Sequence, residues 1–194
     1  MIITFCGHRE LYDKKEVRAW LKRVTEDLIV NGAETFYLGG YGAFDRLAAS
    51  VLAEQKKRYP HIELVLILPY LNRRKDISPC DSSLYPPLES VPKKLAIVKR
   101  NQWMVDQADI VISYVLHSWG GAAKTLEYAQ RKNKKIIFFQ IKITISNKII
   151  GRIKISYTVD LLVILRFFFY NFYKLILCIF IKKYRKKVRS LHYF

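Results

Sequence analysis

The sequence contains few cysteines and histidines, the residues that form disulfides in small secreted proteins and bind metal ions. It has only three cysteines, Cys6, Cys80 and Cys178, which lie far apart and form no CxxC pair. The four histidines include no i, i+4 pair, and no convincing Ser/His/Asp or Cys/His constellation is present. The N-terminus also lacks the basic segment and long apolar run of a secretory signal. We therefore expect no disulfide framework, no metal site and a reduced, cytoplasmic setting.

Acidic residues are also scarce. The 194 residues contain 16 Asp+Glu against 34 Lys+Arg, a net charge of +18, yet 51% are hydrophobic. Disordered basic chains lack so much apolar content, so a folded domain is expected. Residues 1–140 carry 22 basic and 15 acidic side chains, whereas residues 141–194 carry 12 and one. We infer a domain over residues 1–140 and a hydrophobic, basic tail over residues 141–194.

Short apolar runs alternate with amphipathic segments in the first part of the chain. The expected strands are residues 2–6, 35–38, 62–68, 110–115 and 136–139, and the expected helices are residues 17–29, 43–59, 93–107 and 120–132. Apolar strands alternating with helices indicate a parallel sheet covered on both faces. The sequence therefore predicts an α/β fold, a Rossmann-like three-layer sandwich with a mostly parallel sheet of about five strands. Residues 70–91, rich in Pro and Ser, predict a long loop of the kind that often forms a binding lid.

Glycine is infrequent, but it is concentrated where such a sheet binds its ligand, beyond the carboxyl ends of the strands. Gly39-Gly40-Tyr41-Gly42 opens one expected helix and Gly120-Gly121 opens another. Glycine permits close backbone approach, and a helix N-terminus attracts anions. One such turn is explained equally well by backbone geometry alone. Two turns at the same edge favour a phosphorylated, nucleotide-like ligand that contacts both.

The segments that follow the expected strands at this edge are residues 7–9, 39–46 and 117–125. The candidate ligand-binding residues lie in or beside them. They are Gly7, His8, Arg9, Gly39, Gly40, Tyr41, Gly42, Asp45, Arg46, Arg100, Asn101, Gly120, Gly121, Ala122 and Thr125. The three arginines can pair with phosphate. The alternatives are a solvated Arg9, a His8 bonded to backbone and an Arg100 that points into water.

A second group of candidates concerns stacking and catalysis. Tyr41, Tyr70 and Trp119 are candidates for stacking on a base, with ordinary packing as the alternative. Glu127 and Asp45 are the carboxylates nearest the two glycine turns, and any hydrolysis would rely on them.

Four segments together resemble the SLOG superfamily, and within it the YpsA-like small bacterial and phage group of unknown function. They are Phe5–Arg9, Gly39–Asp45, Lys99–Asp106 and Gly120–Ala122, and the resemblance spans about residues 1–138. At longer range the chain is similar to the Lonely Guy phosphoribohydrolases and to the Rossmann core of the DNA-processing protein that loads recombinase on single strands. The resemblance implies a Rossmann-like fold and a nucleotide, ADP-ribose or NAD-derived ligand. Because relatives often form dimers, it also admits a homodimer.

Comparison with the Lonely Guy motif, PGGxGTxxE, indicates whether the resemblance also implies catalysis. A glutamate and an arginine serve cleavage of the N-glycosidic bond there, and Glu127 and Arg100 are the catalytic candidates here. Gly120 and Gly121 match the motif, whereas three positions depart from it: Trp119, Ala123 and Lys124. The leading expectation is therefore binding or sensing of a nucleotide-derived ligand. The alternatives are a nucleoside-monophosphate phosphoribohydrolase and a single-stranded nucleic-acid binder, the latter disfavoured because most of the excess charge lies in the tail.

The tail admits three interpretations. Residues 161–181 are long enough to cross a bilayer, but a central Arg or Lys costs roughly 2.5 to 3.5 kcal/mol on insertion scales. With the basic residues 182–187 this segment suggests a membrane-associated helix over residues 161–187, which is the only membrane contact expected. It is otherwise a helix packed on the domain, or a frameshifted or read-through end. The last is favoured, because the family resemblance stops where the composition changes.

Overall fold

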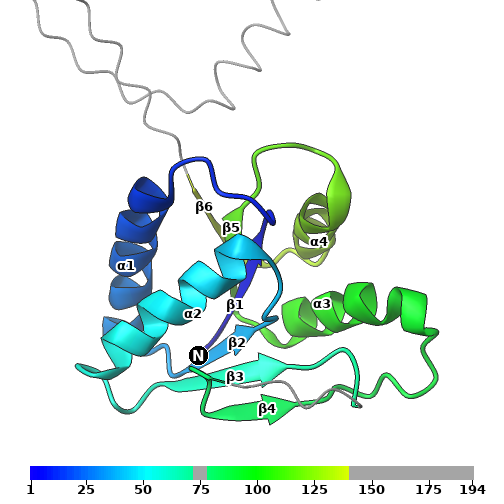
Figure 1. Cartoon of the computed structure of the whole chain (residues 1–194), viewed down its shortest axis with the longest axis horizontal. Coiled ribbons are helices and arrows are strands. Elements are labelled where there is room, and N and C mark those ends of the chain that lie inside the picture. Colours follow the sequence, from blue (N-terminus) through cyan, green and yellow to red (C-terminus); the bar gives the residue numbers. More distant parts are fainter. Residues whose placement is uncertain (72–77, 140–194) are drawn as a thin grey trace, which may run out of the picture. The chain divides into compact units, whose positions relative to one another are not determined.

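The computed structural model describes residues 1–71 and 78–139. Within them the chain forms a six-stranded, fully parallel sheet with the strand order β4-β3-β2-β1-β5-β6 (Figure 1). The strands are β1 (Ile2–Gly7), β2 (Thr35–Leu38), β3 (Glu63–Ile67), β4 (Ser82–Leu84), β5 (Ile110–Tyr114) and β6 (Lys135–Phe138). The helices are α1 (Lys14–Val30), α2 (Gly42–Lys56), α3 (Ala96–Gln107) and α4 (Gly120–Arg131), with a short 3-10 turn, η1 (Lys93–Leu95), before α3. The predicted Rossmann-like α/β fold is confirmed.

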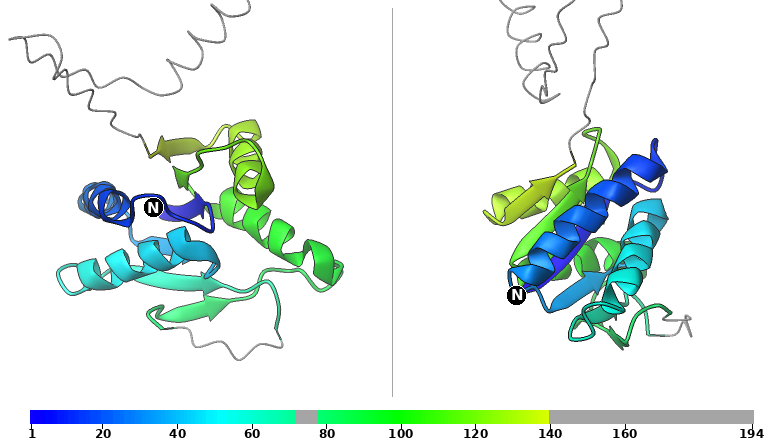
Figure 2. Two further views of the ribbon diagram at one scale, coloured as in Figure 1. Left: turned by 45° about the horizontal axis from the view of Figure 1, so that its top comes forward. Right: turned by 90° about the vertical axis from the view of Figure 1, so that its left-hand side faces the viewer.

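The helices cover the sheet in two layers, α1 and α2 on one face and α3 and α4 on the other (Figure 2). The alternation of side chains along β1 shows why both faces must be apolar. Ile3 and Phe5 belong to the core under α1 and α2, whereas Cys6 packs on the opposite side with Val111 and Ala129. A strand buried on both faces has no polar side, which explains its continuous apolar sequence.

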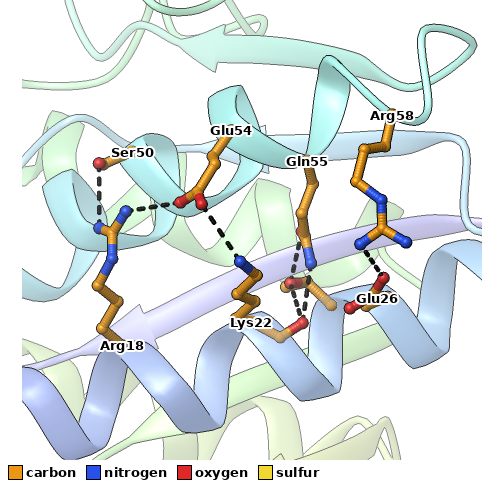
Figure 3. Close-up of polar contacts among 8 residues, drawn as sticks. Arg18, Lys22, Glu26, Ser50, Glu54, Gln55 and Arg58 are labelled. Carbon is orange, nitrogen blue, oxygen red and sulfur yellow. Dashed lines mark hydrogen bonds and ion pairs between the residues drawn. The ribbon is translucent and has the colours of Figure 1, made fainter.

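Polar side chains join α1 to α2 along their outer surface (Figure 3). Glu54 of α2 accepts from Arg18 at 2.7 Å and from Lys22 at 3.2 Å. Beneath these exposed pairs, the hydroxyl of Thr25 donates to Oε1 of Gln55 at 2.7 Å, and both side chains are buried. The two helices are therefore fixed to each other by a buried hydrogen bond as well as by apolar packing.

The segment predicted as one long loop contains a strand. Ser82–Leu84 pairs in parallel with β3 as the edge strand β4, which gives the sheet its sixth strand. Asp81 anchors it, since its carboxylate accepts from the Leu64 N–H at 2.8 Å and pairs with Lys56 at 2.5 Å. Part of the proposed lid, residues 72–77, lies outside the described residues.

The predictions made for residues 141–194 also fall outside the described residues. Across residues 1–71 and 78–139, the structure has no helix with both the length and the apolar character that a membrane crossing requires.

The strand order places a topological switch point at β1. From β1 the chain moves outward through β2 and β3 to β4, and α3 then carries it back to β5 on the other side of β1. Cys6 is paired with Ser113 and Gly7 with Tyr114. The loops that leave β1 and β5 therefore diverge above their carboxyl ends, where open parallel sheets hold their ligands.

Candidate functional site

A cavity of about 520 Å³ opens at this edge of the sheet. Most of the predicted site residues line it: Gly7, His8, Arg9, Gly39, Tyr41, Asp45, Arg100, Asn101, Gly120, Gly121, Ala122 and Thr125. Other lining residues were not among the predicted ones, and they include Cys6, Glu10, Tyr12, Ile97 and Met104. His117 also lines the cavity, and it begins the segment 117–125 that its position after a strand selected.

Four of the predicted ligand-binding and catalytic residues are absent from the lining, and so is Tyr70, one of the stacking candidates. Gly40 and Gly42 serve the turn before α2, with φ of 70° and 89°. Arg46 is exposed. Glu127 has a side chain that is 65% exposed, and its carboxylate lies 4.0 Å from the guanidinium of Arg131 on the same helix. The two catalytic candidates are thus separated, since Arg100 lines the cavity and Glu127 does not.

Arg100 is a buried cation in the cavity wall. Only 2% of the residue is exposed, and its Nη1 donates to the carbonyls of Gly39 at 2.6 Å and Ile67 at 2.8 Å. Its Nε is buried without a hydrogen-bond partner among the described residues. Burial lowers the pKa of the guanidinium, and the nearby Asp45 acts in the opposite direction. Among the described residues Arg100 forms no ion pair, so the wall holds a positive charge that a bound anion would stabilise.

The first glycine turn is closed by groups of the protein itself. The Ala43 N–H donates to the Arg9 carbonyl at 2.9 Å, and the Tyr41 N–H donates to the Asp45 carboxylate at 3.1 Å. A Cβ at Gly39 would lie 2.7 Å from Nη1 of Arg100, closer than real Cβ atoms come to their neighbours. Glycine is required here because Arg100 packs against the backbone. The turn before α2 therefore positions Arg100 and already has a carboxylate where an anion would bind.

The second glycine turn is open. No side chain caps the N-terminus of α4, and a Cβ at either Gly120 or Gly121 would meet nothing within 4 Å. Asn101 of α3 donates to the hydroxyl of Thr125 at 3.2 Å, and that hydroxyl donates to the Gly121 carbonyl at 2.9 Å. These two hydrogen bonds tie the first turn of α4 to α3, and its residues Gly120 and Gly121 line the cavity. Such an N-terminus attracts anions through its unpaired N–H groups and its dipole.

Three aromatic rings form a column beside this open turn. His8 stacks on His117 with centroids 3.6 Å apart, and His117 stacks on Trp119 at 3.8 Å. Nε2 of His8 accepts from the Leu116 N–H at 2.8 Å and from the His117 N–H at 3.4 Å. Burial lowers the pKa of His8, and the neighbouring His117 lowers it further. His8 is therefore neutral at pH 7 and carries its proton on Nδ1.

Two residues of β1 support the cavity floor. A Cβ at Gly7 would overlap the ring of Phe44, so glycine lets α2 pack directly on the strand. The Cys6 thiol donates to the Ala122 carbonyl at 3.1 Å, and burial raises its pKa to about 12. Cys6 is therefore a protonated packing residue, unsuited to act as a nucleophile at neutral pH. In the part of the chain that the structure describes, His, Cys, Asp and Glu do not gather in any group suited to a metal ion.

Comparison with solved structures supports the fold. DNA processing protein A from Streptococcus pneumoniae is 15% identical, with a TM-score of 0.53 over 73% of this chain and 50% of that one. DNA processing protein A from Helicobacter pylori, described for its single-stranded DNA binding mode, is 17% identical, with a TM-score of 0.51 over 74% of this chain and 66% of that one. The chain thus spans only half of the pneumococcal protein.

No protein-family model and no curated protein matches the sequence. At such low identities the structural likeness establishes the fold alone. The comparison confirms the Rossmann-like α/β fold and its likeness in structure to DNA processing protein A.

Proposed function

We propose that the protein binds a small phosphorylated, nucleotide-derived ligand in the cavity at the carboxyl ends of β1 and β5. One observation carries this proposal: the N-terminus of α4, which has no side-chain cap, lines the same cavity as the buried guanidinium of Arg100, which has no ion pair among the described residues. Both features are stabilised by negative charge. A phosphate group is the anion that a helix N-terminus and an arginine most readily hold together.

The contrast between the two glycine turns supports a position for the phosphate at the second turn. Asp45 accepts a hydrogen bond at the start of α2, and its charge would repel an anion there. The turn at Gly120 and Gly121 has neither a cap nor a carboxylate in its first turn. We therefore place the phosphate at α4, with Arg9 at the exposed rim as a further cation. The cavity volume of about 520 Å³ lies in the range of about 300 to 1,000 Å³ typical of small-molecule sites.

The alternatives have less support. A phosphoribohydrolase would need a carboxylate beside the ligand. Glu127 lies outside the cavity lining, and Asp45, which lines the cavity, already accepts a hydrogen bond from the Tyr41 N–H. Release of base from AMP, lost in Glu127→Gln, would identify this activity. Single-stranded nucleic-acid binding is supported by the fold-level likeness to DNA processing protein A and by the net charge of +18, most of which lies in residues 141–194. The narrower YpsA-like grouping and the domain boundary at residue 140 remain predictions.

The proposal is tested by calorimetric titration of the full chain with AMP, ADP-ribose and NAD, with adenosine as the control without phosphate. We expect at least one phosphorylated ligand to bind with a Kd below about 1 mM, more than tenfold tighter than adenosine. Adenosine binding as tightly as the nucleotides would contradict the phosphate site, as would no heat with any of the phosphorylated ligands at that concentration.

A matched pair of variants at Gly121 locates the site. Gly121→Asp places a carboxylate in the first turn of α4. Its negative charge interacts favourably with the helix dipole and repels a bound phosphate. Gly121→Asn has the same shape without the charge. We expect the Asp variant to melt at the same or a higher temperature than the Asn variant and yet to bind at least tenfold more weakly. Equal affinities in the two variants would place the phosphate elsewhere.

A further inference from the structure

The aromatic column of His8, His117 and Trp119 ends in a free face. His8 and Trp119 each lie within 3.8 Å of the His117 centroid and nearly parallel to it, at 18° and 15°. Two parallel rings that both overlap a third at this distance must lie on opposite sides of it. Trp119 is therefore the last ring of the column, and 71% of the residue is exposed. Among the described residues, His117 is its only stacking partner.

The column is held in place from the sheet. Nε2 of His8 accepts two backbone N–H groups from the loop after β5, and Nδ1 of His117 donates to the Trp119 carbonyl at 3.0 Å. The His8 ring itself is 8% exposed and lies edge-on to Tyr114 of β5. The indole is thus oriented by stacking on His117, whose own ring is held by a hydrogen bond in the absence of any ligand. A flat surface that is already ordered loses little conformational entropy when another ring stacks on it.

The position of the column matches the rest of the site. Trp119 is the residue directly before α4, so its ring borders the turn at Gly120 and Gly121 and lines the same cavity as Arg100. An exposed indole at the rim of a polar cavity leaves a large apolar face in water, whereas most tryptophans are largely buried. A planar, apolar ring attached to a phosphate would cover this face while its phosphate reaches α4.

We infer that the free face of Trp119 is a nucleobase subsite, on which a purine ring of a mononucleotide continues the column. This inference rests on the proposed phosphate site and adds the other half of the ligand. A purine fits better than a single ring because its two fused rings match the area of the indole. Stacking of a base on an aromatic side chain is sequence-tolerant, so the subsite selects for a flat base more than for one particular base.

The test compares AMP with ribose 5-phosphate, which has the phosphate but no base. In the full chain we expect AMP to bind about tenfold tighter than ribose 5-phosphate. Trp119→Leu should remove this advantage and leave the affinity for ribose 5-phosphate unchanged, while Trp119→Phe, which keeps a ring, should retain part of it. AMP should also quench tryptophan fluorescence in the native chain and not in Trp119→Phe, because Trp20 and Trp103 lie outside the cavity lining.

The outcomes separate the two proposals. If both compounds bind with equal affinity, or if Trp119→Leu weakens both alike, the base subsite is wrong and the phosphate site stands. If neither compound binds, both proposals are wrong. A different outcome is that a twelve-nucleotide oligodeoxyadenylate binds, that Trp119→Leu weakens this binding, and that AMP does not bind. The column would then recognise bases of a single strand, and the mononucleotide assignment would be overturned.

Discussion

His8 connects β1 to the loop that carries the aromatic column. It lies at the end of β1, and its ring accepts two N–H groups from the loop after β5. These bonds require the neutral ring, because a protonated Nε2 has no lone pair to accept them. The charge state of one side chain therefore controls whether the loop and its aromatic column are held against the sheet.

This dependence predicts a pH effect on stability. Burial and the neighbouring His117 lower the pKa of His8 below its ordinary 6.5, so the unfolded chain binds a proton more readily than the native one. His8 therefore contributes its full stabilisation above about pH 6.5, and part of it is lost as the pH falls below that value. Urea denaturation at pH 7.5, 6.5 and 5.5 measures the free energy of unfolding.

The variant His8→Gln provides the comparison. Glutamine places an oxygen acceptor near the position of Nε2 but does not titrate, so the decrease between pH 6.5 and 5.5 should become smaller. His61→Gln is the control, because His61 is exposed and lies outside the cavity lining. If His8→Gln retains the full pH dependence of the native chain, the decrease arises from other groups.

The predicted residues that line the cavity were identified because they follow strands. The position of each side chain within the site was less predictable. Arg100 lies in the middle of a helix, and its pattern fitted a water-facing side chain as well as a cleft-facing one. Its burial depends on the carbonyls of Gly39 and Ile67, which lie 61 and 33 residues away in the sequence. Local pattern carries no information about such partners.

At the scale of the elements, the packing of α1 on α2 combines two kinds of polar contact. The Arg18–Glu54 and Lys22–Glu54 pairs have side chains more than 40% exposed, where ion pairs are screened by water and salt. The Thr25–Gln55 hydrogen bond is buried, with Thr25 at 0% and Gln55 at 2% exposed. We therefore expect the buried hydrogen bond to contribute more to the free energy of unfolding than the exposed ion pairs do.

We predict that Thr25→Val destabilises the protein by about 1 to 3 kcal/mol, because Oε1 of Gln55 loses its donor in a place that water does not reach. Glu54→Gln should have a smaller effect that disappears in high salt. The double variant Thr25→Val/Gln55→Leu removes both polar partners and should recover part of the loss. Chemical denaturation at low and high salt measures all three. A Glu54→Gln effect larger than that of Thr25→Val would show that the surface pairs dominate.

Helices and strands were predictable from the sequence where their apolar pattern extends over several residues. All four helices and five of the strands follow from apolar periodicity, and glycines mark the starts of α2 and α4. The sixth strand, β4, escaped prediction because Ser82–Leu84 has three residues, two of them serines. It is held by backbone pairing to β3 and by the Asp81 anchor, neither of which has a hydrophobic signature.

At the scale of the whole molecule, the net charge of +18 suggests a polyanionic partner, whereas the cavity suggests a small one. The salt dependence of the binding affinity distinguishes these two kinds of partner. Arg100 is buried, so its interaction with a phosphate is screened less than that of surface lysines. Binding of a polymer that neutralises Z phosphates weakens with a logarithmic slope of about −0.7Z for single strands.

We predict that the affinity for AMP falls by less than about fivefold between 50 and 500 mM NaCl, since only one or two charges and a largely shielded site are involved. Any affinity for a twenty-residue oligodeoxyadenylate should fall by orders of magnitude over the same range. Fluorescence or calorimetric titrations at three salt concentrations give both slopes. An AMP slope as steep as that of the oligonucleotide would place its binding on the basic surface instead.

Because β1 pairs with a strand that comes much later in the sequence, the cavity can form only late in synthesis of the chain. Ile3 is paired with Ile110, which the ribosome adds 107 residues later. At synthesis rates of about 5 to 20 residues per second, β1 waits roughly 5 to 20 seconds for β5. The loop from β5 and the start of α4 follow only after that. A ligand that contacts both β1 and α4 therefore finds its complete site only after α4 has been added, and a fragment that ends before Gly120 lacks half of it.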